Sequence, residues 1–136
     1  MQWAELYRQE TDKPLKQFVK DFKSAGNIRG FIIHNESGME MTHTFGAHGV
    51  QVGQAFDLHM IQICKPEKAA ASLQANLERA ALMPKFVMAF TSDKKTQVRF
   101  LIYSRPMIEA LTGDAAFADS LVESYDAIRN MIKAAL

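Results

Sequence analysis

The sequence predicts an α+β fold: a two-layer sandwich in which a mixed sheet carries its helices mainly on one face. Two observations lead to this prediction. Short segments with strand patterns alternate with segments whose apolar residues recur at helical spacing, in the order βα-β-βα-ββ-αα. In addition, 136 residues with 48% hydrophobic side chains suffice for one domain, residues 1–136, that buries a core.

The first strand is predicted over residues 4–10, followed by a helix that Thr11 or Asp12 caps and that runs to about residue 25. Pro14 suits the first turn of this helix, and Gly26 is predicted to end it. The apolar stripe of the helix consists of Leu15, Phe18, Val19 and Phe22.

Residues 29–34 are predicted to form a buried strand, because their centre is a contiguous run of β-prone apolar residues. The next segment, 35–55, contains four glycines and no sustained period, so it is predicted to be a long loop with little regular structure. Strand character resumes over 56–64. Long loops of this kind are often functional or mobile.

A helix is predicted from Pro66 to about residue 83, where Pro84 ends it. A hairpin of strands 86–90 and 97–103, joined through residues 92–95, follows.

Two helices complete the predicted order. Ser104 is expected to cap a short helix that ends at Gly113, and Asp114 to cap the final helix. The packing stripe of the final helix consists of Phe117, Leu121, Tyr125, Ile128 and Ile132.

Cys64 is the only cysteine, so it cannot form an internal disulfide. It precedes the helix that starts at Pro66, whose backbone N–H groups and dipole favour negative charge. Lys65 offers no side-chain acceptor there. The first-turn amides of Glu67 and Lys68 are therefore left for water, a bound anion or the Cys64 sulfur. The plainer interpretation is that Cys64 is a small buried apolar residue.

Strand alternation places His59 and Cys64 on opposite faces of the strand over 56–64. A thiol–imidazole pair between these two residues would need a bulge. A histidine partner for Cys64 is therefore expected from His34, His43 or His48.

The run from Cys64 to Ala69, with Leu82, Met83 and Pro84 at the far end of the helix, resembles the bacterial family called domain of unknown function three-hundred-and-two. The resemblance covers about residues 55–103. It implies a small, dimeric α+β protein of undetermined function. Lys85 stands where the family pattern has a second cysteine, which removes a dithiol or two-cysteine metal site.

Two candidate sites follow from these patterns. For a small anionic or sulfur-containing ligand, the candidate residues are Cys64, Glu67, Lys68, Lys85 and Arg99. Arg105 is a further basic residue expected near the sheet, although scattered basic side chains also serve solubility. For copper, zinc or haem, the candidate ligands are His43, His48, Met39 and Met41, whose spacing matches no firm zinc motif.

A formal net charge of +1 gives no reason to expect a nucleic-acid partner, and no run is long enough to cross a membrane. We therefore expect a cytoplasmic protein. Phosphate-binding glycine loops and the common hydrolase motifs are absent, which leaves open whether the chain is an enzyme. The leading hypothesis is an accessory small-ligand or thiol-linked binding protein that forms a homodimer. The alternatives are a metal- or haem-associated protein and a structural dimerisation module.

Overall fold

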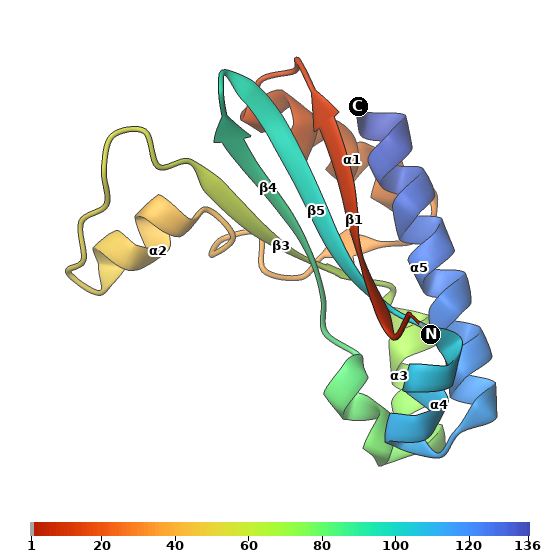
Figure 1. Ribbon diagram of the computed structural model, residues 1–136. Helices are drawn as coiled ribbons and strands as arrows, with labels where there is room; N and C mark the ends of the chain where they lie inside the picture. Colours follow the sequence, from red (N-terminus) through yellow and green to blue (C-terminus); the bar gives the residue numbers. More distant parts are fainter. Residues whose placement is uncertain (1) are drawn as a thin grey trace.

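The structure is a computed structural model that describes residues 2–136. Within them, a five-stranded sheet in the order β1-β5-β4-β3-β2 packs against helices (Figure 1), which confirms the predicted α+β class. The elements are β1 (Ala4–Thr11), α1 (Leu15–Ile28), β2 (Ile32–Ile33), α2 (Met41–Ala47), β3 (Leu58–Cys64), α3 (Pro66–Ala75), the 3-10 helix η1 (Leu77–Leu82), β4 (Lys85–Ser92), β5 (Lys95–Tyr103), α4 (Arg105–Thr112) and α5 (Ala115–Ala135).

Every strand pair of the sheet is antiparallel, which corrects the prediction of a mixed sheet. The reason lies in the connection between β3 and β4. The segment α3–η1 bends back instead of crossing the sheet, so β4 begins beside the end of β3, with Lys85 opposite Ile63. A crossover helix along the sheet would have made these two strands parallel.

Helix α1 begins and ends at different residues from those predicted. Pro14 occupies the N-cap position, and no side chain caps the helix. Gly26 lies inside the helix, where a Cβ atom would come within 2.9 Å of Cε of Met131 on α5. The glycine that ends α1 is Gly30, with φ +82°, while the N–H of Phe31 donates to the carbonyl of Gly26. The strand predicted over 29–34 is consequently reduced to β2.

The predicted loop over 35–55 contains a helix, α2, which stands out beside β3 in Figure 1. Its N-cap is Glu40, whose carboxylate accepts hydrogen bonds from the backbone N–H groups of Thr42 and His43, each at 3.0 Å. A glutamate is not among the usual N-cap residues, which explains why no helix was predicted at this position. No side chain of α2 is buried.

The helix predicted from residue 66 to about 83 is divided at Asn76 into α3 and η1. Asn76 has an extended backbone, with φ −161°, and its side chain accepts a hydrogen bond from the N–H of Glu78. Leu77, which the continuous helix would have placed on the apolar stripe, is 79% exposed. The division turns the chain back toward the sheet.

The C-terminal half matches its prediction closely. The hairpin β4–β5 is joined by a turn in which Asp93 and Lys94 both have positive φ. Ser104 caps α4, Gly113 ends it in the left-handed conformation, and Asp114 caps α5.

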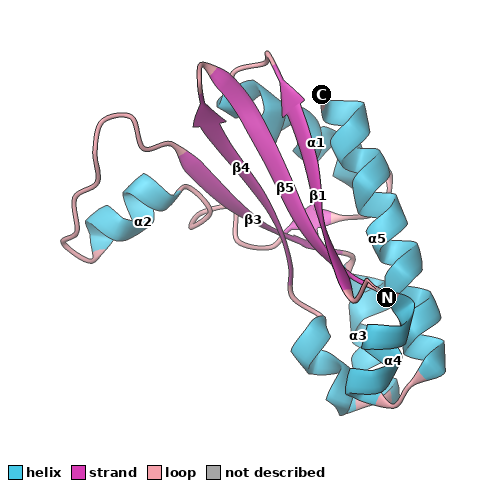
Figure 2. Cartoon of the chain, viewed as in Figure 1, coloured by secondary structure: helices cyan, strands magenta, loops and turns pink. Residues whose placement is uncertain are grey.

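The core lies between one face of the sheet and the helices α1 and α5. Its largest fully buried side chains include Phe18 and Phe22 from α1, Phe100 from β5 and Phe117 from α5. No helix within residues 2–136 covers most of the opposite face of the sheet (Figure 2), and Leu101 on that face is 49% exposed. In the described part of the chain, no helix combines the length and apolar character needed to span a bilayer.

Candidate functional site

A cavity of about 170 Å³ opens at the end of the sheet where β3 leads into α3. The residues on either side of strand β2, the start of β4 and helix α5 supply its other walls. The apolar lining residues include Phe31, Ile63, Leu73, Met83, Phe117 and Leu121. The polar lining residues include His34, Gln62, Cys64, Lys68, Lys85 and Ser124. One water occupies about 30 Å³ in the liquid, so the cavity has room for a small metabolite.

Lys85 is the first residue of β4 and is half-buried. The register that sets it opposite Ile63 places it on the core side of the sheet. Its Nζ atom donates to the carbonyl oxygen of Met83 at 3.1 Å. Burial lowers the pKa of Lys85, and the positive charge of Lys68 lowers it further, whereas a charge on Cys64 acts in the opposite direction.

Lys68 connects the first turn of α3 to α5. Its Nζ atom donates to the hydroxyl of Ser124 at 2.9 Å and to the backbone carbonyl of Ser120 at 3.2 Å. Ser124 is itself buried. These contacts fix the ammonium group of Lys68 at the wall of the cavity.

Cys64 and His34 line the same cavity, so the structure brings the thiol near one of the three histidines predicted as its partner. Cys64 is the last residue of β3 and is half-buried. The N-cap residue Lys65 makes no side-chain hydrogen bond to the start of α3, as the sequence predicted. His59 lies on the opposite, core-facing side of β3.

The charged residues that line the cavity are all basic. Its lining contains Lys65, Lys68 and Lys85 and no aspartate or glutamate. Among the described residues, neither Lys68 nor Lys85 has a carboxylate within ion-pair distance. The hydrogen-bond acceptors of both ammonium groups are neutral oxygen atoms, so their positive charge is not compensated locally.

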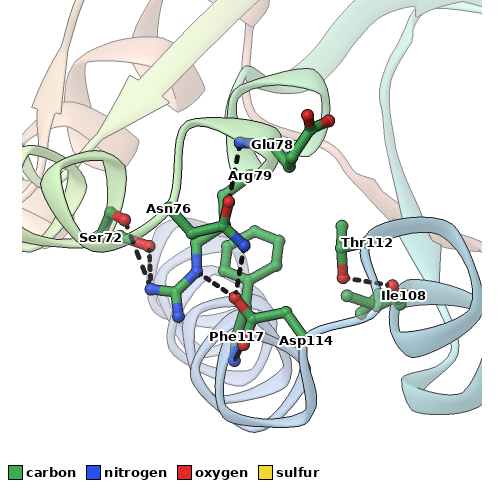
Figure 3. A network of polar contacts seen from close by, with 8 residues as sticks. All are labelled: Ser72, Asn76, Glu78, Arg79, Ile108, Thr112, Asp114 and Phe117. Carbon is green, nitrogen blue, oxygen red and sulfur yellow. Dashed lines mark hydrogen bonds and ion pairs between the residues drawn. The ribbon is translucent and has the colours of Figure 1, made fainter.

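A polar network holds the α3–η1 wall against α5 (Figure 3). The Nε atom of Arg79 donates to Asp114 at 2.7 Å, and the side-chain amide of Asn76 donates to the same carboxylate at 3.0 Å. A second nitrogen of Arg79 donates to the hydroxyl of Ser72, a lining residue, at 3.1 Å. The guanidinium also lies over the ring of Phe117, with 5.3 Å to the centroid. The network therefore positions one side of the cavity.

Two of the predicted ligand-binding residues lie away from this cavity. Glu67 is exposed on the first turn of α3 and is not a lining residue. Arg99 stacks over Phe90 on the open face of the sheet, and it lines a separate cavity that also reaches Lys85. Arg105 forms ion pairs with Asp119 and Glu109 and does not line the cavity either.

The candidate metal ligands lie on and around α2. His43 and His48 are exposed, while Met39 packs partly against the core and Met41 is half-buried. Within residues 2–136, no three side chains of His, Cys, Asp or Glu gather in a metal-binding arrangement. Binding of copper, zinc or haem by this segment stays a prediction, which elemental analysis and an absorption spectrum of the purified protein would check.

Sequence reasoning missed the contribution of α5 to the cavity. Ser120 and Ser124 directly precede Leu121 and Tyr125, two residues of the packing stripe of the final helix. Nothing in the sequence shows that α3 packs beside these serines. Phe31, which directly precedes the short strand β2, lines the cavity as well as packing in the core. Its ring lies under the Nζ atom of Lys65 at 5.7 Å.

Two of three comparisons with known proteins find a match for this chain. The model of the family described as Domain of unknown function DUF302 matches residues 7–135. The structure is similar to that of an uncharacterized conserved protein DUF302 from Bacillus stearothermophilus, with a TM-score of 0.77. The two share 13% sequence identity over 96% of this chain and 98% of that chain, so the similarity concerns the fold. The search of curated proteins finds no match.

Proposed function

This chain belongs to the family described as Domain of unknown function DUF302, and from the geometry of its cavity we propose that it is an accessory protein that binds a small anionic ligand. The binding groups in this proposal are Lys68 and Lys85. Cys64 forms part of the wall and contacts the ligand, which allows a sulfur-containing ligand. The proposal includes no reaction, and it places the protein in the cytoplasm, where a single free thiol is stable.

One observation carries this proposal: two ammonium groups share a cavity that has no carboxylate in its lining. Buried charges are normally paired, because removing them from water is costly. An anion between Lys68 and Lys85 would supply that missing partner. Two charge-assisted hydrogen bonds in a half-enclosed site are stronger than the same bonds on an open surface.

The size and walls of the cavity support a small ligand. Apolar side chains such as Phe117 and Leu121 form much of the lining, as in most small-molecule sites. With about 170 Å³, the cavity is smaller than a typical site for a drug-sized ligand. A carboxylate or a single phosphate or sulfate group with a short carbon chain fits these properties.

The proposal is tested by nuclear magnetic resonance titration of the ¹⁵N-labelled protein with phosphate, sulfate and glycolate at constant ionic strength. Backbone amides around the cavity are expected to shift, and the Lys68→Met and Lys85→Met variants to bind at least about tenfold more weakly, about 1.4 kcal/mol each. Lys20→Met, at an exposed position on α1, is the matched control.

Circular dichroism of each variant establishes that it is folded. The proposal is wrong if the cavity amides do not respond to any of the three anions. It is also wrong if Lys20→Met weakens binding as much as the two cavity variants do, because the effect would then come from overall charge.

We also propose that two copies of the chain associate through the open face of the sheet. The final helix and the last strand are the two elements considered for this interface. The apolar stripe of α5 is occupied by core packing, whereas Leu101 on β5 and Leu6 on β1 pair with each other and are 49% and 43% exposed. A second copy of the chain would cover these side chains.

A further inference from the structure

The position of Lys85 distinguishes it from the exposed lysines of this chain. It shares the core-facing side of β4 with Val87 and Ala89, both 0% exposed. Its side chain therefore leaves the sheet toward the buried layer and ends in the cavity. The only hydrogen-bond acceptor recorded for its amine, among the described residues, is the carbonyl of Met83.

The surroundings of Lys85 raise the neutral fraction of its amine above that of an exposed lysine, while the ammonium form is the one that binds an anion. Burial lowers its pKa, and the ammonium group of Lys68 on the facing wall contributes in the same direction. A neutral lysine amine has a free lone pair, and an apolar pocket next to a second cationic group is the environment that activates lysine as a nucleophile. Lys68 is less suited to act as the nucleophile, because its Nζ atom donates hydrogen bonds to Ser124 and Ser120.

We propose that Lys85 forms an imine with a small carbonyl compound that carries an anionic group, such as an aldehyde acid or a 2-oxo acid. This inference rests on the proposed anion site, because Lys68 holds the anionic group and thereby directs the carbonyl carbon toward Nζ of Lys85. Holding the two reactants in one cavity turns a bimolecular step into an intramolecular one.

The reaction needs no oxidant or reductant. The lone pair of Nζ attacks the carbonyl carbon, and the carbonyl π electrons move to oxygen to give a carbinolamine once a proton has passed from nitrogen to oxygen. The carbon–oxygen bond then breaks, and water leaves with the second amine proton as the C=N bond forms. Both hydrogen atoms of the water come from the amine, and hydrolysis reverses each step.

Reductive trapping of the full chain tests the proposal, with glyoxylate as the probe and cyanoborohydride as the reductant that makes the imine permanent. Peptide mass spectrometry is expected to find the reduced adduct at Lys85 at least about tenfold faster than at Lys20. Lys85→Arg keeps the charge and should abolish this fast phase while leaving the slow labelling of exposed lysines unchanged. Adducts that form on Lys20 and Lys85 at equal rates would overturn the proposal.

A second pair of probes separates this inference from the proposed function. Lys68→Met is expected to slow trapping of glyoxylate by a larger factor than trapping of propanal, because propanal has no anionic group and loses only the effect of Lys68 on the pKa of Lys85. Glycolate, which has the anion but no carbonyl, should compete with glyoxylate. If glycolate shifts the cavity amides and glyoxylate still gives no fast adduct, the imine is refuted and the anion site stands. If glycolate has no effect either, both are refuted.

Discussion

Arg79 and Asp114 lie 35 residues apart in the sequence and form an ion pair of 2.7 Å, in which both side chains are largely shielded from solvent. Asp114 also caps α5 by accepting a hydrogen bond from the N–H of Phe117 at 2.9 Å. One carboxylate thus starts the longest helix and holds the wall of the cavity in place (Figure 3).

The first prediction concerns acid stability. Hydrogen bonds from Arg79 and Asn76 hold the pKa of Asp114 well below its usual range. The ionised Asp114 carboxylate therefore stabilises the fold fully above the unfolded-state pKa of about 3.9. This stabilisation is lost as the pH falls toward the lower pKa that Asp114 has in the folded protein. Asp114→Asn should unfold at lower urea concentration at pH 7, with a difference from wild type that narrows below about pH 4. Asp12→Asn, at a position 89% exposed, is the control.

A second pH dependence is expected from His59. Its side chain is buried, its Nδ1 atom has no hydrogen-bond partner among residues 2–136, and burial lowers its pKa. The charges of Asp57 and Glu40 oppose this effect and that of Lys16 adds to it. Because the unfolded chain binds the proton more readily, native stability should fall as the pH drops below about 6.5, by at most about 1.4 kcal/mol per pH unit.

Urea titrations at several pH values would measure this loss of stability. His59→Leu should remove the part of the pH dependence of unfolding free energy that comes from His59. His48→Leu, at an exposed position, should leave that pH dependence unchanged. A wild-type curve that is flat between pH 7 and 5 would contradict the assignment.

A third prediction distinguishes the two glycines near the end of α1. Gly30→Ala should destabilise the protein by about 1–2 kcal/mol, because an L-residue at φ +82° is strained. Gly26→Ala should have a smaller effect, since only the flexible end of Met131 must move and the helix gains propensity. Urea denaturation of both variants compares them directly. An equal or reversed order would mean that Gly30 does not end the helix.

The proposed dimer predicts a position-specific effect of charge. Leu101→Glu should raise the dissociation constant at least about tenfold, because a carboxylate on the covered face would lose its hydration. Leu111→Glu, on α4 and 56% exposed, is the matched control. Sedimentation velocity at several concentrations gives both constants. A wild-type chain that is monomeric at micromolar concentration would rule out the dimer.

Alkylation of Cys64 tests whether the thiol belongs to the binding cavity. Iodoacetamide should modify the native protein, because the side chain is only half-buried, and a bound anion should slow the reaction. Mass spectrometry across a range of pH measures the rate, with Cys64→Ser as the blank. Modification that requires unfolding would show that Cys64 is a packing residue only.

The elements that could be predicted from the sequence are those whose signals are local. Ser104 and Asp114 cap the helices that follow them, and the hairpin turn uses residues next to its strands. The end of α1 could not be predicted in this way, since the role of Gly26 depends on Met131, a residue of the last helix. The division at Asn76 depends likewise on Asp114.

The candidate site was predictable to a similar extent. Cys64, Lys68 and Lys85 stand near a helix start and a strand start, so the sequence selected them as a set. Their common cavity depends on the return of the chain through η1 and on the docking of α3 beside Ser124. Periodicity describes single elements and carries no information about which elements meet.

The segment between β2 and β3 is the part of the fold best suited to accept an insertion. Helix α2 buries no side chain. Beyond Asn35, which makes two side-chain hydrogen bonds to the backbone of β3, this segment meets the sheet mainly through the bridge between Glu40 and His59 and a hydrogen bond from the N–H of Met60 to the carbonyl of Met39. The tip between Gly49 and Gly53 should therefore accept an inserted peptide or a reporter domain without loss of the core. It is a suitable position for a fusion that leaves the cavity beside α3 accessible.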